Sequence, residues 1–205
     1  MIVPSMSKEE VIREMLFDFD IVRRKSVFIL KDVQKQLIKS KNYPYVQAYD
    51  YVSPKTKNNW IYILEFQNKK DIFQTFVNYH YTSIGLMAGL VTNDMEITFY
   101  TGHFFSRFVE REGLEIINPI DKIKEFFKLN PVLGSEPQGE LDGGAREFIG
   151  RVKTGVVLGI RSKKNILVCN TYLSNEMLRK DQALITNSLK VELENYQRMV
   201  DERLI

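Results

Sequence analysis

The hydrophobic period of the chain changes at Gly102, and this change limits the possible folds more than any other feature. From Met95 to Phe99, apolar side chains recur at every second residue, which is the period of a strand. After the glycine, four apolar residues share a sector of about 140° on a helical wheel: Phe104, Phe105, Phe108 and Val109. The sequence therefore predicts a strand followed by a helix over about residues 103–112. A chain that combines both periods is neither all-α nor all-β.

Other segments extend this mixed pattern in both directions. Pro119 opens a second short helix, and the glycine-containing stretch 131–145 predicts a long loop. Alternating apolar residues predict a hairpin and, later, an antiparallel meander. The hairpin strands are Tyr45–Val52 and Trp60–Phe66; residues 71–101 also have a mostly β-like pattern; the second helix is Ile120–Leu129; the meander strands are Phe148–Lys153, Val156–Arg161 and Ile166–Leu173.

Helical periodicity also marks both ends of the chain. Ser7 and Glu10 form a capping box that begins an amphipathic N-terminal segment. Ser174 caps a final helix that reaches toward Glu202, spans about 42 Å and packs on the core or on a second copy of the chain. We therefore predict an α+β fold, with an antiparallel sheet packed by helices, and a dimer. The predicted division is a helical segment 1–43, a core 44–173 and a C-terminal helix 174–205.

The composition is that of a folded chain with a real core. Apolar residues make up 44% and charged residues 27%, and the formal net charge is +3. The sequence shows neither a signal-peptide pattern nor an apolar run long enough for a membrane span, so we expect a cytoplasmic protein with no membrane partner. The one cysteine, Cys169, lies in an apolar run and predicts a small buried side chain.

Several common catalytic motifs are missing from the sequence. It has no phosphate-binding glycine loop, no dinucleotide fingerprint, no zinc-protease motif, no paired cysteines and no nucleophile elbow. His80, His103 and Cys169 have no regular ligand spacing and would need a further carboxylate to hold zinc. His80 itself lies between two tyrosines and is interpreted as a hydrogen-bonded structural histidine. We expect no metal and no cofactor.

One polar face of the helix at residues 103–112 is a candidate catalytic site. His103, Arg107, Glu110 and Arg111 share a sector of about 100° opposite the apolar residues. Two guanidiniums can hold a phosphate while an imidazole moves a proton, which is what cleavage of RNA through its 2′-hydroxyl requires. The simpler interpretation is a solvated helix face on which Glu110 pairs with one of the arginines.

A second group of candidates lies on the meander. Six of the residues from Arg146 to Lys164 are Arg or Lys and only Glu147 is acidic, which makes this the most basic short region of the chain. The predicted substrate-binding residues are Arg151, Lys153, Arg161 and Tyr172. The alternatives are a solvated strand face for the cations and packing for the tyrosine.

The segment Met95–Arg111 is similar to the opening of small members of the barnase, EndoU, colicin and RelE-like superfamily. There too a strand leads into a helix that opens with histidine and carries arginine four and eight residues later, followed by a second helix and an antiparallel meander. The resemblance extends over residues 97–173. It implies a metal-independent ribonuclease or a toxin-like RNA-binding protein, with His103 as acid or base and Arg107 and Arg111 as phosphate holders.

The hypothesis from a different class is a non-catalytic protein-interaction or assembly module that binds a protein partner, or a second copy of itself, through its amphipathic C-terminal helix. The sequence leaves open whether the chain is an enzyme. An exposed apolar patch and a concentration-dependent mass would favour the module, and RNA cleavage would favour the nuclease.

Overall fold

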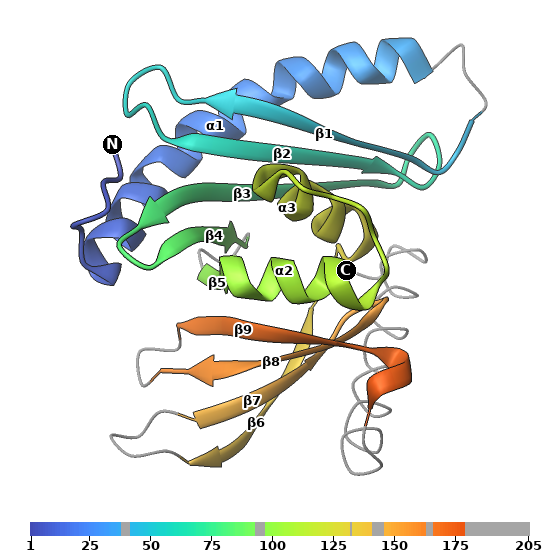
Figure 1. Cartoon of the computed structure of the whole chain (residues 1–205). Coiled ribbons are helices and arrows are strands. Elements are labelled where there is room, and N and C mark those ends of the chain that lie inside the picture. The colour runs from blue at the N-terminus through green and yellow to red at the C-terminus, as the bar shows by residue number, and fades with distance from the viewer. Residues whose placement is uncertain (38–41, 93–96, 132, 141–145, 163–165, 179–205) are drawn as a thin grey trace. The chain divides into compact units, whose positions relative to one another are not determined.

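The computed structural model describes residues 1–37, 42–92, 97–131, 133–140, 146–162 and 166–178, with residues 135–140 described by their backbone alone. The chain divides into two compact units, Met1–Ile97 and Thr98–Ile205. This boundary falls inside the predicted core 44–173. Each unit combines helices with strands, so the fold class is α+β, as predicted (Figure 1).

The first unit is one long helix on a four-stranded antiparallel meander. The helix is α1 (Lys8–Leu37), and Figure 1 shows it in blue along one face of the strands. Neighbouring strands are also neighbours in the sequence, and β1 lies at the edge of the meander. The strands are β1 (Tyr45–Val52), β2 (Asn59–Phe66), β3 (Ile72–Thr82) and β4 (Gly85–Val91).

The predicted capping box is confirmed at the start of α1. The backbone N–H of Ser7 donates to the Glu10 carboxylate at 2.7 Å, and the Glu10 N–H donates to the Ser7 hydroxyl at 3.3 Å. The helix buries a stripe of residues that includes Met15, Phe19 and Val22. Phe19 meets Phe76 of β3 edge to face at a centroid distance of 5.4 Å.

A buried carboxylate fixes α1 to the β1–β2 hairpin. Asp18 has no exposed surface and accepts three hydrogen bonds. The donors are the Ser53 hydroxyl at 2.6 Å, the Thr56 hydroxyl at 2.8 Å and the Trp60 indole N–H at 2.8 Å. A charge taken out of water is tolerated when hydrogen bonds replace its hydration. Helix and hairpin are therefore joined by polar as well as apolar contacts.

The described residues of the second unit form a five-stranded mixed sheet with two α-helices. Its strand order is β5-β9-β8-β7-β6, and only the β5–β9 pair is parallel. The predicted strand, helix, helix and meander are all confirmed, within one or two residues at their ends. The elements are β5 (Ile97–Thr101), α2 (Gly102–Arg111), α3 (Pro119–Leu129), β6 (Gly134–Glu140), β7 (Arg146–Arg151), β8 (Gly155–Arg161) and β9 (Leu167–Ser174).

Capping side chains mark the start of both short helices, and a glycine follows the end of α2. Thr101 caps α2 by accepting from the Phe104 N–H, and Asn118 caps α3 with Pro119 at its first turn. Gly113, at φ 64°, follows α2 in the left-handed region that favours glycine. The two helices meet through an aromatic cluster around Phe126, which meets Phe104 at a centroid distance of 4.9 Å.

Close packing between β8 and its neighbours depends on a glycine. A Cβ built at Gly159 would collide with the Val168 carbonyl oxygen of β9 and with the Phe148 ring of β7. The Phe148 side chain is almost fully buried and occupies the space that a larger residue at position 159 would need.

The prediction of a long loop over residues 131–145 is wrong in part. Residues 134–140 form β6, which pairs antiparallel with β7 and contains an irregularity between Pro137 and Glu140. Proline donates no backbone hydrogen bond, and an edge strand tolerates that loss. Residues 134–140 contain glycine and proline and no large apolar side chain, so the sequence has no alternating pattern here that would predict a strand.

Most of the predicted C-terminal helix lies outside the described residues. After β9 the structure shows one short 3-10 turn, η2 (Asn175–Met177), and Leu178 is the last residue described. The predicted helix start at Ser174 is wrong, because the Ser174 side chain makes no capping hydrogen bond, the turn is a 3-10 helix and Leu178 has an extended backbone. The part of the predicted helix beyond Leu178, and the dimer that depends on it, stay predictions. None of the helices among the described residues combines the length and apolarity that crossing a bilayer needs.

Candidate functional site

Three residues on the polar face of α2 were predicted to form one site: His103, Arg107 and Arg111. No described contact brings their side chains together. His103 is exposed on the first turn, and Arg107 forms an ion pair with Glu110 at 2.7 Å. Arg111 donates from Nη1 to the backbone carbonyl of Tyr172 on β9. A helix rises about 12 Å over the eight residues from His103 to Arg111, so the two side chains serve different parts of the surface.

A different group of polar side chains does converge, at the C-terminal end of α2. The Tyr172 hydroxyl donates to Glu112 Oε1 at 2.6 Å and lies 2.9 Å from the Thr154 hydroxyl oxygen. The Thr154 hydroxyl and N–H both reach the Asn130 side-chain oxygen, at 3.0 and 2.9 Å. We call Arg111, Glu112, Asn130, Thr154 and Tyr172 the Tyr172 cluster.

The five members of the Tyr172 cluster come from four parts of the second unit. Arg111 is the last residue of α2 and Glu112 is its C-cap, whereas Asn130 is the C-cap of α3. Thr154 lies in the tight turn between β7 and β8, and Tyr172 lies on β9. The C-terminal ends of α2 and α3 therefore lie near the β7–β8 turn, at one end of the strands.

Tyr172 links a carboxylate and a guanidinium. Its hydroxyl holds Glu112, and its own carbonyl oxygen holds Arg111. Burial raises the pKa of the Tyr172 hydroxyl well above its usual value, and the hydrogen bond to Glu112 raises it further. The phenol therefore stays a neutral donor, and its full burial keeps it from touching a ligand directly.

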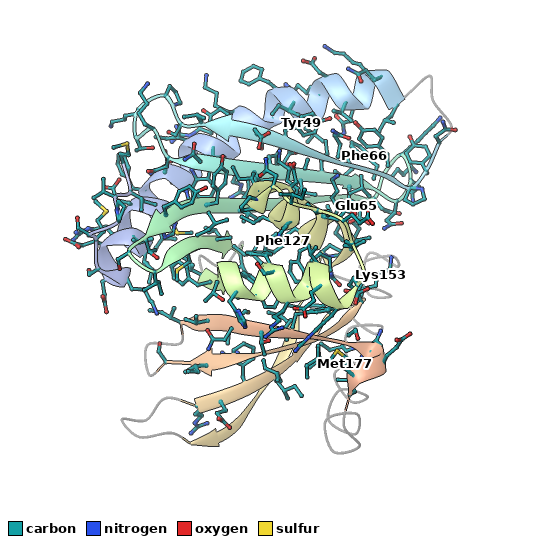
Figure 2. All side chains as sticks on the ribbon, viewed as in Figure 1. Tyr49, Glu65, Phe66, Phe127, Lys153 and Met177 are labelled. Carbon is teal, nitrogen blue, oxygen red and sulfur yellow. The ribbon has the colours of Figure 1, made fainter. Side chains whose placement is uncertain are left out.

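Arg151 and Lys153 are close in sequence to Thr154, a member of the Tyr172 cluster. Burial lowers the pKa of the half-buried Arg151, and an electrostatic interaction with Tyr172 opposes that shift. Lys153 is exposed in the turn, next to Thr154, and is labelled in Figure 2. Arg161 is at the opposite end of β8, about 20 Å along the strand from Gly155. The structure thus brings Arg111 and Arg151 to Tyr172, places Lys153 next to Thr154 in the chain, and separates Arg161 from them.

Sequence reasoning missed Glu112, Thr154 and Asn130. Glu112 directly follows Arg111, but its partner Tyr172 is 60 residues later in the chain. Asn130 precedes a proline at the end of a predicted helix, which is a position where a polar cap is common. That pattern was the one local signal for this site.

His80 and Cys169 lie in surroundings typical of residues with a structural role. His80 is 6% exposed, and its Nδ1 lies 3.0 Å from the Asn78 side-chain oxygen, as a hydrogen-bonded structural histidine would. Cys169 is fully buried, as predicted, and burial raises the pKa of its thiol. Among the described residues, no group of His, Cys, Asp and Glu side chains could hold a metal ion.

The Tyr172 cluster contains one carboxylate and one guanidinium, each held by a hydrogen bond to Tyr172. Glu112 is half-buried, and Tyr172 occupies only Oε1 of its two carboxylate oxygens. A guanidinium has five N–H donors, so Arg111 can contact an anion while it holds the Tyr172 carbonyl. Comparison of the chain with family models, curated proteins and solved structures gives no match.

Proposed function

We propose that the second unit binds RNA and cleaves it at the Tyr172 cluster, using charges that its own side chains supply. The observation that carries the proposal is that Tyr172 positions Glu112 with its hydroxyl and Arg111 with its carbonyl. A carboxylate and a guanidinium held by the same residue suit a reaction in which a proton leaves a hydroxyl while charge grows on a phosphate.

The proposed reaction is transesterification within the RNA strand. Glu112 takes the proton of a 2′-hydroxyl, and the 2′-oxygen attacks the adjacent phosphorus. The bond from phosphorus to the 5′-oxygen breaks, and water protonates the departing oxygen. Arg111 and Arg151 balance the charge that develops on the phosphate oxygens. The products are a 2′,3′-cyclic phosphate and a free 5′-hydroxyl.

His103 and Arg107 have a binding role in this proposal. Both lie on the exposed side of α2, and the Arg107 side chain is 39% exposed despite its ion pair with Glu110. An exposed ion pair is weak, so a phosphate can replace the carboxylate. Loss of His103 should therefore weaken substrate binding by a few fold. If His103 were a catalytic acid or base, its loss would reduce the cleavage rate far more.

The test is incubation of the full chain with single-stranded RNA in the presence of a chelator. Glu112→Gln should reduce the cleavage rate by at least about 100-fold, the lower end of what a general base contributes. Glu115→Gln is the matched control, because Glu115 is an exposed glutamate in the loop after α2. Wild-type protein that leaves the RNA intact would refute the nuclease proposal.

The second candidate function is non-catalytic binding or assembly. The specific observation in its favour is that Tyr172 is fully buried and that the contacts of Arg107 and Arg111 are ones a purely structural role would also use. If this candidate function is the correct one, Glu112→Gln should lower the stability of the protein, and there should be no RNA cleavage for it to change.

A further inference from the structure

The outward face of α1 carries two exposed aromatic rings on the same line. Phe17 is 54% exposed and Phe28 is 66% exposed, although most large apolar side chains of this unit are buried. The rings are eleven residues apart, which is three helical turns plus about 20°, so they project in the same direction about 16 Å apart. The apolar stripe that includes Met15, Phe19 and Val22 faces the other way, into the core of the unit.

A lysine lies over each of these two rings. Lys55 Nζ is 4.9 Å from the centroid of Phe17, and Lys25 Nζ is 5.9 Å from the centroid of Phe28. Beyond Phe17, the exposed charged residues of α1 on the side of the two rings are mostly basic: Arg24, Lys25, Lys31 and Lys35 against Asp20 and Asp32, with Lys35 3.5 Å from Asp32. This surface, which we call the α1 outer face, therefore combines aromatic rings with an excess of positive charge.

We propose that the α1 outer face binds single-stranded nucleic acid. Bases stack on exposed aromatic rings, and lysine and arginine side chains contact the phosphates between them. The class of ligand rests on the proposed function, and the inference adds to it a nucleic-acid-binding surface in the first unit.

A membrane surface fits these observations less well. A helix that lies in a lipid interface needs a wide apolar stripe to insert, and the wide stripe of α1 is already buried. On the outer face, charged residues such as Arg24 separate the rings, and a lysine ammonium lies over one side of each ring. Two rings separated in this way offer two stacking sites and form no continuous apolar patch.

The test measures binding of the full chain to a labelled deoxythymidine oligonucleotide of about 20 nucleotides. This DNA has no 2′-hydroxyl and cannot undergo the proposed cleavage, so the binding result is independent of the nuclease proposal. The double variant Phe17→Ala/Phe28→Ala should bind at least about tenfold more weakly. Ile84→Ala, which removes an 85% exposed side chain from the β3–β4 turn of the same unit, should bind like wild type.

The charges of the same face give a second readout. Lys25→Gln/Lys31→Gln should reduce the slope of log affinity against log salt by about 1.4, since each cation lost removes about 0.7 for a single strand. Unchanged affinity of the double phenylalanine variant, with a thermal midpoint equal to wild type, would overturn the proposal. So would wild-type binding to phosphatidylserine vesicles in place of the oligonucleotide.

Discussion

Asp18 shows at the scale of one residue how the first unit is held together. Its carboxylate accepts from Ser53, Thr56 and Trp60 and has no contact with water. Asp18→Ala leaves three buried donors without an acceptor, and we expect it to lower the free energy of unfolding by about 3–5 kcal/mol. Urea denaturation followed by tryptophan fluorescence measures this change directly, because Trp60 is the one tryptophan in the chain.

Asp20 provides the control for this prediction. It is an exposed aspartate on the same helix. Asp20→Ala should change the free energy of unfolding by no more than about 0.5 kcal/mol, as is usual for surface substitutions. Equal effects of the two substitutions would show that the Asp18 hydrogen bonds contribute nothing specific.

His80 makes the stability depend on pH. Burial lowers its pKa from 6.5 to about 4, so the folded state favours the neutral ring. The unfolded chain binds a proton first as the pH falls, and the stability that is complete above pH 6.5 is lost progressively toward pH 4. We expect a loss on the order of 2 kcal/mol between about pH 6.5 and pH 5.

The measurement is the urea midpoint of wild type and His80→Gln at several pH values in this window. The variant should lose less stability than wild type on acidification, since glutamine does not titrate. Parallel pH curves for the two proteins would contradict a buried neutral histidine.

At the scale of elements, Tyr172 joins α2 to the sheet. Its hydroxyl lies within hydrogen-bond distance of Glu112 and Thr154, and its ring packs on Phe108 at a centroid distance of 5.3 Å. Tyr172→Phe keeps the ring and removes the hydroxyl, so we expect a loss of about 1–3 kcal/mol in thermal or urea denaturation. Tyr81→Phe alters a tyrosine that is 56% exposed and should change stability little. A similar loss in both variants would count against the Tyr172 cluster.

The sequence predicts elements well where the signal is local. The cap at Ser7, the aromatic stripe of α2 and the helix start at Pro119 depend on residues within a turn or two of one another, and the structure confirms them. β6 is not predicted by the sequence because residues 134–140 lack alternating apolar side chains. The parallel pairing of β5 with β9 is not predicted either, since Thr98 and its partner Leu167 are far apart in the chain.

The candidate site was predictable only in pieces. Arg111, Arg151 and Tyr172 were each chosen for a separate reason, and nothing local indicates that Arg111 bonds to the Tyr172 carbonyl. Glu112 was overlooked because a glutamate that ends a helix usually points into solvent. A site made from the ends of four elements depends on tertiary packing, which residue spacing does not encode.

At the scale of the whole molecule, the charge is nearly balanced. A formal net charge of +3 is too small to attract RNA by itself, so binding depends on where the cations are placed. Two such places are the α1 outer face and the surroundings of Arg111, Arg151 and Lys153. RNA affinity should therefore fall as salt rises, and fluorescence anisotropy at several salt concentrations measures the slope. An affinity that does not change with salt would contradict a phosphate-contacting protein.

The account depends most on the claim that Tyr172 holds Glu112 and Arg111 ready to act on a phosphodiester. Mass spectrometry of a single-stranded RNA, incubated in chelator with wild type or with Glu112→Gln, tests it most directly. The account predicts fragments that end in a 2′,3′-cyclic phosphate with wild type and almost none with the variant. Intact RNA with wild type, or equal cleavage by both proteins, would contradict it.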